Sequence, residues 1–211
     1  MRDTDAGLEA LMVRRSSKLA FAGGMWVFPG GRVDPDDAAP YRPGDVFEAA
    51  RRAAVREARE EAGLVVDAEA LVRLSHWVPP PVTPKRFATW FFLAPAPGGS
   101  VVVDGGEIHD HRWLRPGDAL ARRDAGEIEL APPTWVTLHD LAAHADVGAA
   151  LAHARAREPE HFETHVARVE GGLAALWEGD AGYDAGDADA PGPRHRLLML
   201  ETGWRYERDD T

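Results

Sequence analysis

Residues 56–64 read Arg-Glu-Ala-Arg-Glu-Glu-Ala-Gly-Leu, a run in which three glutamates lie close together. On an α-helix, residues three or four positions apart share one face, so Glu57, Glu60 and Glu61 are predicted to converge. Like charges placed in this way repel one another and destabilise a helix by roughly a few tenths of a kcal/mol per pair. Because Mg²⁺ takes hard oxygen ligands, the pattern predicts a divalent cation between the three carboxylates.

The helix that carries these glutamates is predicted to begin at Asp45 and to end near Ala62. Asp45 and Glu48 have the spacing of a capping box at a helix N-terminus. Gly63 follows the last turn, where the left-handed conformation favours glycine. Upstream, residues 26–31 read Trp-Val-Phe-Pro-Gly-Gly, which predicts a short strand that ends in a tight turn.

This combination resembles the Nudix box, whose pattern is G-x5-E-x7-R-E-U-x-E-E-x-G-U, with U a bulky aliphatic residue. The residues that match its second half at the required spacing are Glu48, Arg56, Glu57, Ala58, Glu60, Glu61, Gly63 and Leu64. The resemblance implies an α/β fold, an α/β/α sandwich around a mixed β-sheet, over about residues 8–145. We therefore expect one Nudix hydrolase domain over residues 1–211, with a C-terminal extension of helices and strands over about residues 146–211.

The first half of the box departs from the pattern. Sixteen residues lie between Gly31 and Glu48, where five are expected, so an insertion of about eleven residues extends the loop over residues 34–45. A lengthened loop at this point resembles that of the peroxisomal coenzyme A diphosphatase branch of the superfamily. Residues 132–141 strengthen that resemblance. The Leu-Leu-Thr-x-Arg signature that often precedes the box in this branch is absent. Coenzyme A, NADH, ADP-ribose and nucleotide sugars therefore stay open as substrates.

A Nudix enzyme hydrolyses a diphosphate that links a nucleoside to another group. The resemblance assigns the ligands of Mg²⁺ or Mn²⁺ to Glu57, Glu60 and Glu61, and further ligand positions to the Gly30 carbonyl, Glu48 and Glu107. Arg56 is expected to fix the rotamer of a neighbouring carboxylate. Glu57 or Glu61 takes the proton of the attacking water, and the sequence does not choose between them.

Three of these assignments have simpler alternatives. Glu48 alone fits a helix-capping residue or an anchor of the box loop, and Glu107 alone fits a surface acid beside a turn. Arg14 and Arg15 follow the first predicted strand and are candidate ligands for substrate phosphate, since arginine offers bidentate geometry. Arginines in such positions are more often surface charges.

Composition limits the class of protein. The formal charge of −11 argues against a nucleic-acid surface. No run approaches the roughly 18–20 apolar residues that cross a bilayer, and the N-terminus lacks the features of a secretion signal. The chain has no cysteine, which excludes disulfides and thiolate catalysis. We expect a cytoplasmic enzyme that acts on a small molecule, and leave a homodimer through the tail open.

The alternative function is a catalytically inactive Nudix-fold module that binds a ligand or regulates another protein. Degenerate members of the family usually lose a box glutamate, and none is lost here. A histidine metal site is not expected, because His161 and His165 read as strand residues, as do His109 and His111, and neither pair has a third convergent ligand.

Hydrophobic periodicity predicts the remaining elements. Strands are expected at residues 8–13, 71–77, 87–93, 107–114 and 196–200, and helices at residues 116–122, 133–144 and 147–157. Residues 171–172 predict a hairpin turn, and residues 180–193 a mobile loop. Only seven residues precede the first strand, so either the strand that usually comes before it in the family is missing or the chain begins late relative to its relatives.

Overall fold

The computed structural model describes residues 1–18, 22–38, 45–83, 86–103 and 105–209. The chain divides into two compact units. The first unit comprises Met1–Leu74 and Phe92–Glu158, and the second comprises Ser75–Phe91 and Pro159–Thr211. The glutamate-rich segment belongs to the first unit. Residues 39–44 of the predicted insertion lie outside the described residues.

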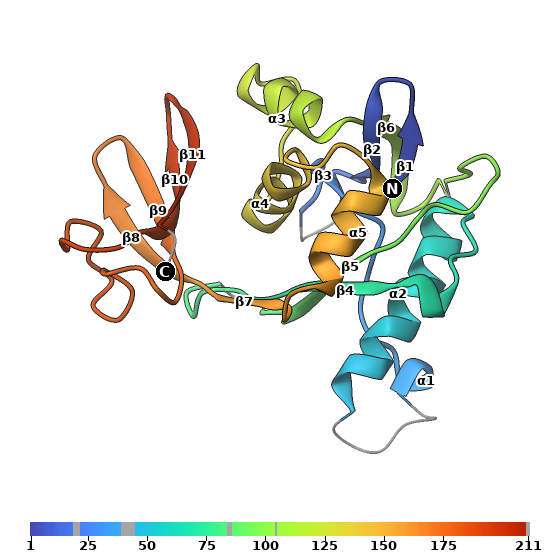
Figure 1. Cartoon of the computed structure of the whole chain (residues 1–211), viewed down its shortest axis with the longest axis horizontal. Helices are drawn as coiled ribbons and strands as arrows, with labels where there is room; N and C mark the ends of the chain where they lie inside the picture. The colour runs from blue at the N-terminus through green and yellow to red at the C-terminus, as the bar shows by residue number, and fades with distance from the viewer. Residues whose placement is uncertain (19–21, 39–44, 84–85, 104, 210–211) are drawn as a thin grey trace. The chain divides into compact units, whose positions relative to one another are not determined.

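The first unit contains a four-stranded antiparallel sheet around β2 (Gly7–Arg15) (Figure 1). The strands that pair with β2 are β1 (Arg2–Thr4), β3 (Trp26–Val27) and β6 (Ile108–Leu114). Residues 10–13 of β2 are all buried. The strands predicted at residues 8–13 and 107–114 are confirmed, and a short strand, β1, does precede the first of them.

Helix α2 (Val46–Ala62) presents alanines to the core, and a smaller helix, α1 (Pro35–Ala38), precedes it. Gly63 ends α2 with φ 68°, as predicted, and its N–H donates to the Arg59 carbonyl at 3.0 Å. Small side chains let the helix pack closely, and Ala62 joins Leu11 and Ile108 in one buried cluster.

The predicted capping box is wrong. Asp45 has φ −80° and ψ 64°, and its side chain makes no capping hydrogen bond. The Glu48 carboxylate instead accepts a hydrogen bond of 2.9 Å from Arg51 Nε. A charged donor one turn along the helix binds a carboxylate more strongly than a neutral backbone N–H does.

The other helices of the first unit agree with the periodicity. They are α3 (Pro116–Asp124), α4 (Pro132–Leu141) and α5 (Val147–Arg155), and the 3-10 helix η1 (Ala68–Ala70) follows α2. Strands β4 (Val72–Val78) and β5 (Thr89–Leu93) run into the second unit and confirm two more predictions. Among the described residues, no helix is both long enough and apolar enough to span a membrane.

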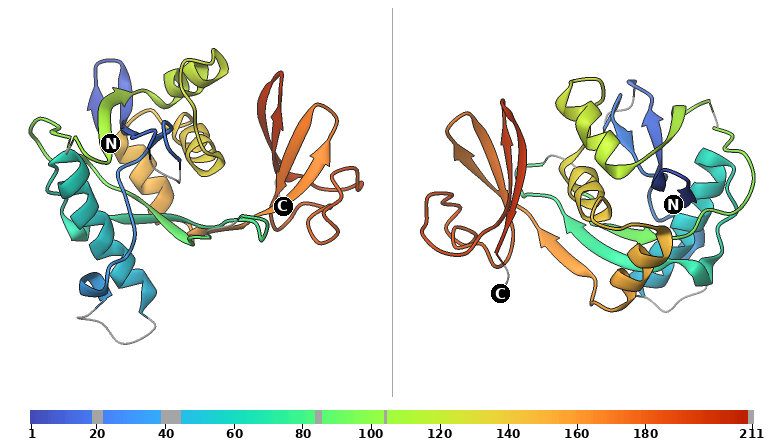
Figure 2. Two further views of the ribbon diagram at one scale, coloured as in Figure 1. Left: turned by 180° about the vertical axis from the view of Figure 1, so that it is seen from behind. Right: turned by 45° about the horizontal axis from the view of Figure 1, so that its top comes forward.

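The second unit is a β structure (Figure 2). β7 (Glu160–Glu163) pairs in parallel with β4. An antiparallel meander follows, formed by β8 (His165–Val169), β9 (Gly172–Leu176), β10 (His195–Leu200) and β11 (Gly203–Arg208). Gly171 has φ 74° in the predicted hairpin turn between β8 and β9. Residues 180–193 contain no helix or strand, as predicted, although Asp180 is buried.

Candidate active site

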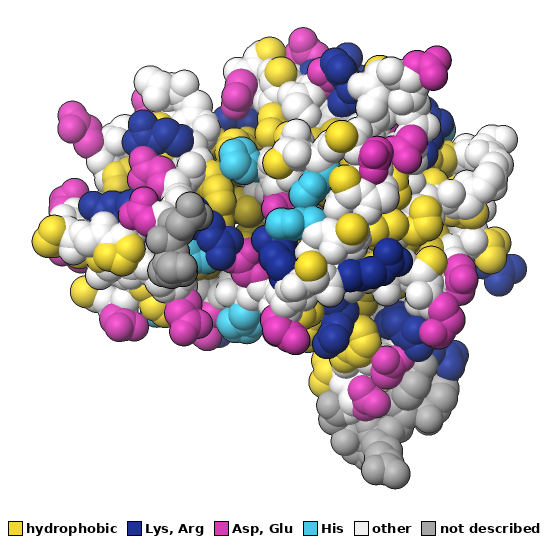
Figure 3. All heavy atoms as spheres, viewed as in Figure 1, with side chains coloured by type: hydrophobic (Ala, Val, Ile, Leu, Met, Phe, Trp, Pro, Cys, Tyr) yellow, Lys and Arg dark blue, Asp and Glu magenta, His cyan; other side chains and the backbone are white. Residues whose placement is uncertain are grey.

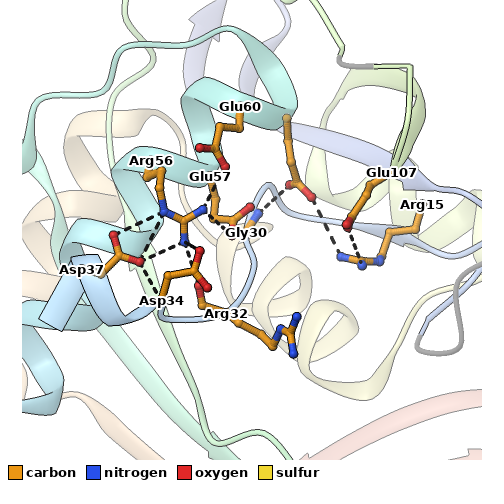
Figure 4. Close-up of polar contacts among 10 residues, drawn as sticks. Arg15, Gly30, Arg32, Asp34, Asp37, Arg56, Glu57, Glu60 and Glu107 are labelled. Carbon is orange, nitrogen blue, oxygen red and sulfur yellow. Dashed lines mark hydrogen bonds and ion pairs between the residues drawn. The ribbon is translucent and has the colours of Figure 1, made fainter.

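Arg56 lies at the centre of a group of acids (Figure 4). Its Nη1 donates to the carboxylates of Glu57 and Glu60, at 2.9 Å each. Its Nη2 donates to Asp37 at 2.9 Å and to the Arg32 carbonyl at 2.8 Å. The predicted contact between Arg56 and a neighbouring carboxylate is therefore present, and it restricts the rotamers of two box glutamates together.

Asp37 is a site residue that the sequence reasoning missed. Burial of its side chain would raise its pKa, but the hydrogen bonds from Arg56 and from the Asp34 N–H, together with the charges of Arg56 and Arg52, outweigh that effect and lower the pKa. Asp37 also accepts the Asp34 N–H at 2.9 Å, while the Asp37 N–H donates to the Asp34 carbonyl at 3.0 Å. The contact from the Asp34 N–H to the Asp37 carboxylate is one half of a capping box, with Pro35 at the first helical position, so the sequence Asp-Pro-x-Asp was the overlooked signal.

Gly31 gives Glu57 room to approach the turn. A Cβ at Gly31 would lie 2.1 Å from Glu57 Oε1, so a larger residue there would displace the carboxylate. Burial raises the pKa of Glu57; Arg56 opposes this effect, and Glu60 and Glu107 add to it. The turn that the sequence places before the box therefore fits against the helix that carries the glutamates.

Glu61 is the most buried of the glutamates in this group, with 4% of its surface exposed. Its carboxylate accepts the Gly30 N–H at 2.8 Å, and Arg15 Nη1 lies 4.0 Å away. Burial raises the pKa of Glu61 to about 7, the Gly30 hydrogen bond opposes the rise, and the charge of Glu57 adds to it. Gly30 thus contributes its N–H to the site, and the role of its carbonyl as a metal ligand stays a prediction.

Glu107 reaches the same group from a distant part of the chain. Its carboxylate lies 3.3 Å from Arg15 Nη2, and its carbonyl accepts the Ser16 N–H at 2.7 Å. The pairing of β2 with β6 shifts register between Arg14 and Arg15, and such irregularities re-aim side chains. Arg15 therefore lies between two acids, Glu61 and Glu107, in this structure.

The comparisons with known proteins agree with this arrangement. The family model described as NUDIX domain matches residues 1–155. The chain belongs to the Nudix family. It is 26% identical over 159 residues to putative nudix hydrolase 7 of Caenorhabditis elegans, in a match that covers 58% of this chain and 52% of the worm protein. The chain thus spans about half the length of this curated relative.

Solved structures give the same fold. A Nudix hydrolase from Alicyclobacillus acidocaldarius superposes with a TM-score of 0.64 at 27% identity, covering 72% of this chain and 91% of the other. The predicted family and the predicted Nudix fold are confirmed. The predicted enzyme class, a Nudix-type diphosphate hydrolase, agrees with the names that these relatives carry.

Two predicted Nudix site residues are not brought to the group. Glu48 pairs with Arg51 at 2.7 Å, and it lies nine residues before Glu57, about 13 Å along the helix axis. Arg14 is exposed, and its Nε donates to the Gly24 carbonyl at 3.4 Å. Arg14 lines a separate open cavity of about 360 Å³ together with Trp26 and other residues.

The Nudix acids suit a hard divalent cation. Carboxylates outnumber the two arginines that face them, and burial raises the pKa of both Glu57 and Glu61. A cation among them would offset the cost of burying their negative charge. Glu57, Glu60 and Glu61 supply the oxygen donors on α2, and Glu107 faces them from the position just before β6.

Proposed function

We propose that this chain hydrolyses the diphosphate linkage of a nucleoside diphosphate derivative, with Mg²⁺ or Mn²⁺ held by Glu57, Glu60 and Glu61. The observation that carries the proposal is the cluster of box acids around the turn at residues 30–31, where carboxylates exceed arginines. A solvated helical face would not bury Glu61 or fit Glu57 against a glycine backbone.

The chemistry divides between the ion and the chain. A bound divalent ion lowers the pKa of its water and neutralises phosphate oxygens. Glu57 or Glu61 takes the proton of the attacking water, and each is held in place, Glu57 by Arg56 and Glu61 by the Gly30 N–H. Arg56 acts as a positioning residue, because its guanidinium contacts carboxylates on α2 and on α1.

Coenzyme A or an acyl derivative is the substrate that we propose to test first. The support is the long segment between Gly31 and Glu48, which resembles the coenzyme A diphosphatase branch. The start of that segment is ordered by Asp37, whose carboxylate holds Arg56. NADH, ADP-ribose and a nucleotide sugar serve as competing substrates.

Product release from these four substrates, measured with Mg²⁺, with Mn²⁺ and with a chelator, tests the proposal. We expect ion-dependent turnover in the wild type and a loss of at least ~10⁴-fold in the Glu60→Gln/Glu61→Gln variant, since metal stabilisation of the transition state is worth several kcal/mol. Glu158→Gln, at an exposed acid outside the group, is the matched control. Intact turnover in the double variant, or turnover without any ion, overturns the site.

The inactive-module alternative gives a different result. A thermal-shift screen of the same compounds would then raise the melting temperature through binding alone, by RT ln(1 + [L]/Kd), while no product forms with either ion. Ligand-induced stabilisation together with turnover supports the enzyme.

A further inference from the structure

A second group of metal-ligating side chains lies apart from the glutamates. Among the described residues, Asp140, His144 and His153 each offer one ligand atom, and these atoms all lie within 4.8 Å of one another. Asp140 and His144 are partly buried, and His153 is exposed. Histidine side chains gather over the region of α4 and α5 on the face drawn in Figure 3.

Helix α4 and the turn after it place two of the three ligands. Asp140 belongs to the last turn of α4, and the His144 N–H continues that turn by donating to the Leu141 carbonyl at 3.1 Å. Leu141 is only 1% exposed, so this end of the helix is anchored in the core. The two ligands are four positions apart, the spacing that puts side chains on one side of a helical turn.

Helix α5 supplies the third ligand. Its N-terminus is capped by Asp146, whose carboxylate accepts the Ala149 N–H at 2.7 Å, and Leu151 on the same helix is buried. The imidazole rings of His144 and His153 lie with centroids 4.8 Å apart and planes inclined by 49°. Two anchored helices thus bring two imidazoles and one carboxylate together.

The donor set differs in chemistry from that of the glutamate site. Two imidazole nitrogens and a carboxylate oxygen suit Zn²⁺ and its first-row neighbours, whereas an all-oxygen set suits Mg²⁺. Zinc bonds of about 2.0–2.2 Å keep any two ligand atoms within about 4.4 Å of each other, slightly less than the 4.8 Å within which all three lie here. Partly exposed side chains can rotate to come that close, and Arg157 lies 3.8 Å from Asp140 as its present partner.

We propose that Asp140, His144 and His153 bind one divalent transition metal of the Zn²⁺ class, with water in a remaining coordination position. The site would tie the C-terminal end of α4 to α5. It does not depend on the proposed diphosphate hydrolysis, since none of the three residues belongs to the glutamate group.

Calorimetric titration of the full chain with Zn²⁺, in saturating Mg²⁺ to occupy the glutamates, tests this site. We expect one zinc site in the wild type. In His144→Ala and in His153→Ala, zinc affinity should fall by more than the ~100-fold that follows loss of an outer-shell partner of a metal ligand. The visible spectrum of bound Co²⁺ should disappear in the same two variants.

Two controls keep the outcomes distinct. His139→Ala removes an exposed histidine from the same helix and should retain the site. Glu60→Gln/Glu61→Gln should lose hydrolysis and retain zinc, whereas His144→Ala should lose zinc and retain hydrolysis. The proposal is overturned if the wild type binds no zinc, if His139→Ala weakens binding as much as His144→Ala, or if zinc binding follows the glutamates.

Discussion

Each of the two units contains an arginine that pairs with acidic side chains, but the number of acids per arginine differs. In the second unit, Arg196 and Asp180 form a bidentate pair at 2.6 Å for each hydrogen bond, with side chains 4% and 0% exposed. In the first unit, Arg56 faces four carboxylates and remains 26% exposed. Arg196 is thus matched by one acid, whereas Arg56 is outnumbered by the acids around it.

The pKa values follow that balance. Burial would raise the pKa of Asp180, but Arg196 and two backbone N–H groups outweigh burial and lower it. Glu61 has only a distant arginine, so burial prevails and raises its pKa to about 7. A matched buried pair leaves no net buried charge, whereas an excess of buried acid costs stability unless a cation offsets it. This excess is the reason that we propose the functional site in the first unit.

Glu61→Gln should give the largest effect and separate function from stability. The amide still accepts the Gly30 N–H but cannot bind a cation as a carboxylate does, so we expect kcat/KM to fall by about four powers of ten, several kcal/mol of transition-state stabilisation. The melting temperature in chelator should stay equal or rise, because a buried charge is removed. Enzyme kinetics and thermal unfolding measure the two effects, and a large loss of stability would contradict the comparison.

Arg196→Met should have the opposite effect to Glu61→Gln and lower the unfolding free energy. It leaves the Asp180 carboxylate buried without its partner, which costs about 3–5 kcal/mol of unfolding free energy. The double variant Asp180→Leu/Arg196→Met should recover most of that loss, since an apolar pair replaces an ion pair. Urea denaturation measures both.

Arg205→Met, at a side chain that is 66% exposed, is the control and should change the unfolding free energy by less than about 0.5 kcal/mol. If the double variant is no more stable than the single one, Asp180 and Arg196 are not the self-contained pair described above.

The sequence predicted one of these regions much better than the other. Glu57, Glu60 and Glu61 are neighbours on one helix, so their convergence follows from helical periodicity alone. The end of the helix at Gly63 also followed from local sequence, because a single glycine in the left-handed conformation ends it. Asp180 and Arg196 come together only through the fold, and the composition around Asp180 indicated nothing more than a loop.

Long-range contacts also limited what the sequence could predict within the candidate site. Arg15 and Glu107 are 92 positions apart and meet because β2 pairs with β6 through an irregular register. Asp37 was missed because its role depends on Arg56, nineteen positions later. His153 illustrates the same limit, since both helices were predicted from periodicity, while the faces that meet depend on packing.

The pH dependence of stability should differ in sign between the two regions. Glu61 has a raised pKa in the folded state, so in chelator its penalty is present above about pH 7 and is relieved as the pH falls toward 4.5. Asp180 has a lowered pKa, so its contribution is present above 3.8 and is lost as the pH falls further.

Urea denaturation of the wild type and Glu61→Gln from about pH 3 to pH 8, in chelator, isolates the first effect. The difference in unfolding free energy should be of order 3 kcal/mol in favour of the variant at the alkaline end, because the pKa of Glu61 rises from 4.5 to about 7 at about 1.4 kcal/mol per pKa unit, and should vanish below about pH 4.5. The loss of stability at acid pH that comes from Asp180 should remain in both proteins. A constant difference across the range would mean that Glu61 is not a buried, uncompensated acid.

Gly31→Ala should give the smallest effect, confined to the metal ligands. The added Cβ would lie 2.1 Å from Glu57 Oε1, so the carboxylate must move, and a flexible side chain can do this at little cost in stability. We expect Mn²⁺ affinity to fall about tenfold, or about 1.4 kcal/mol, with little change in melting temperature. Gly30→Ala is the matched control, because nothing lies within 4 Å of the Cβ added there. If both variants weaken Mn²⁺ binding equally, the turn matters through its backbone, and the close approach of Glu57 to Gly31 is not what shapes the site.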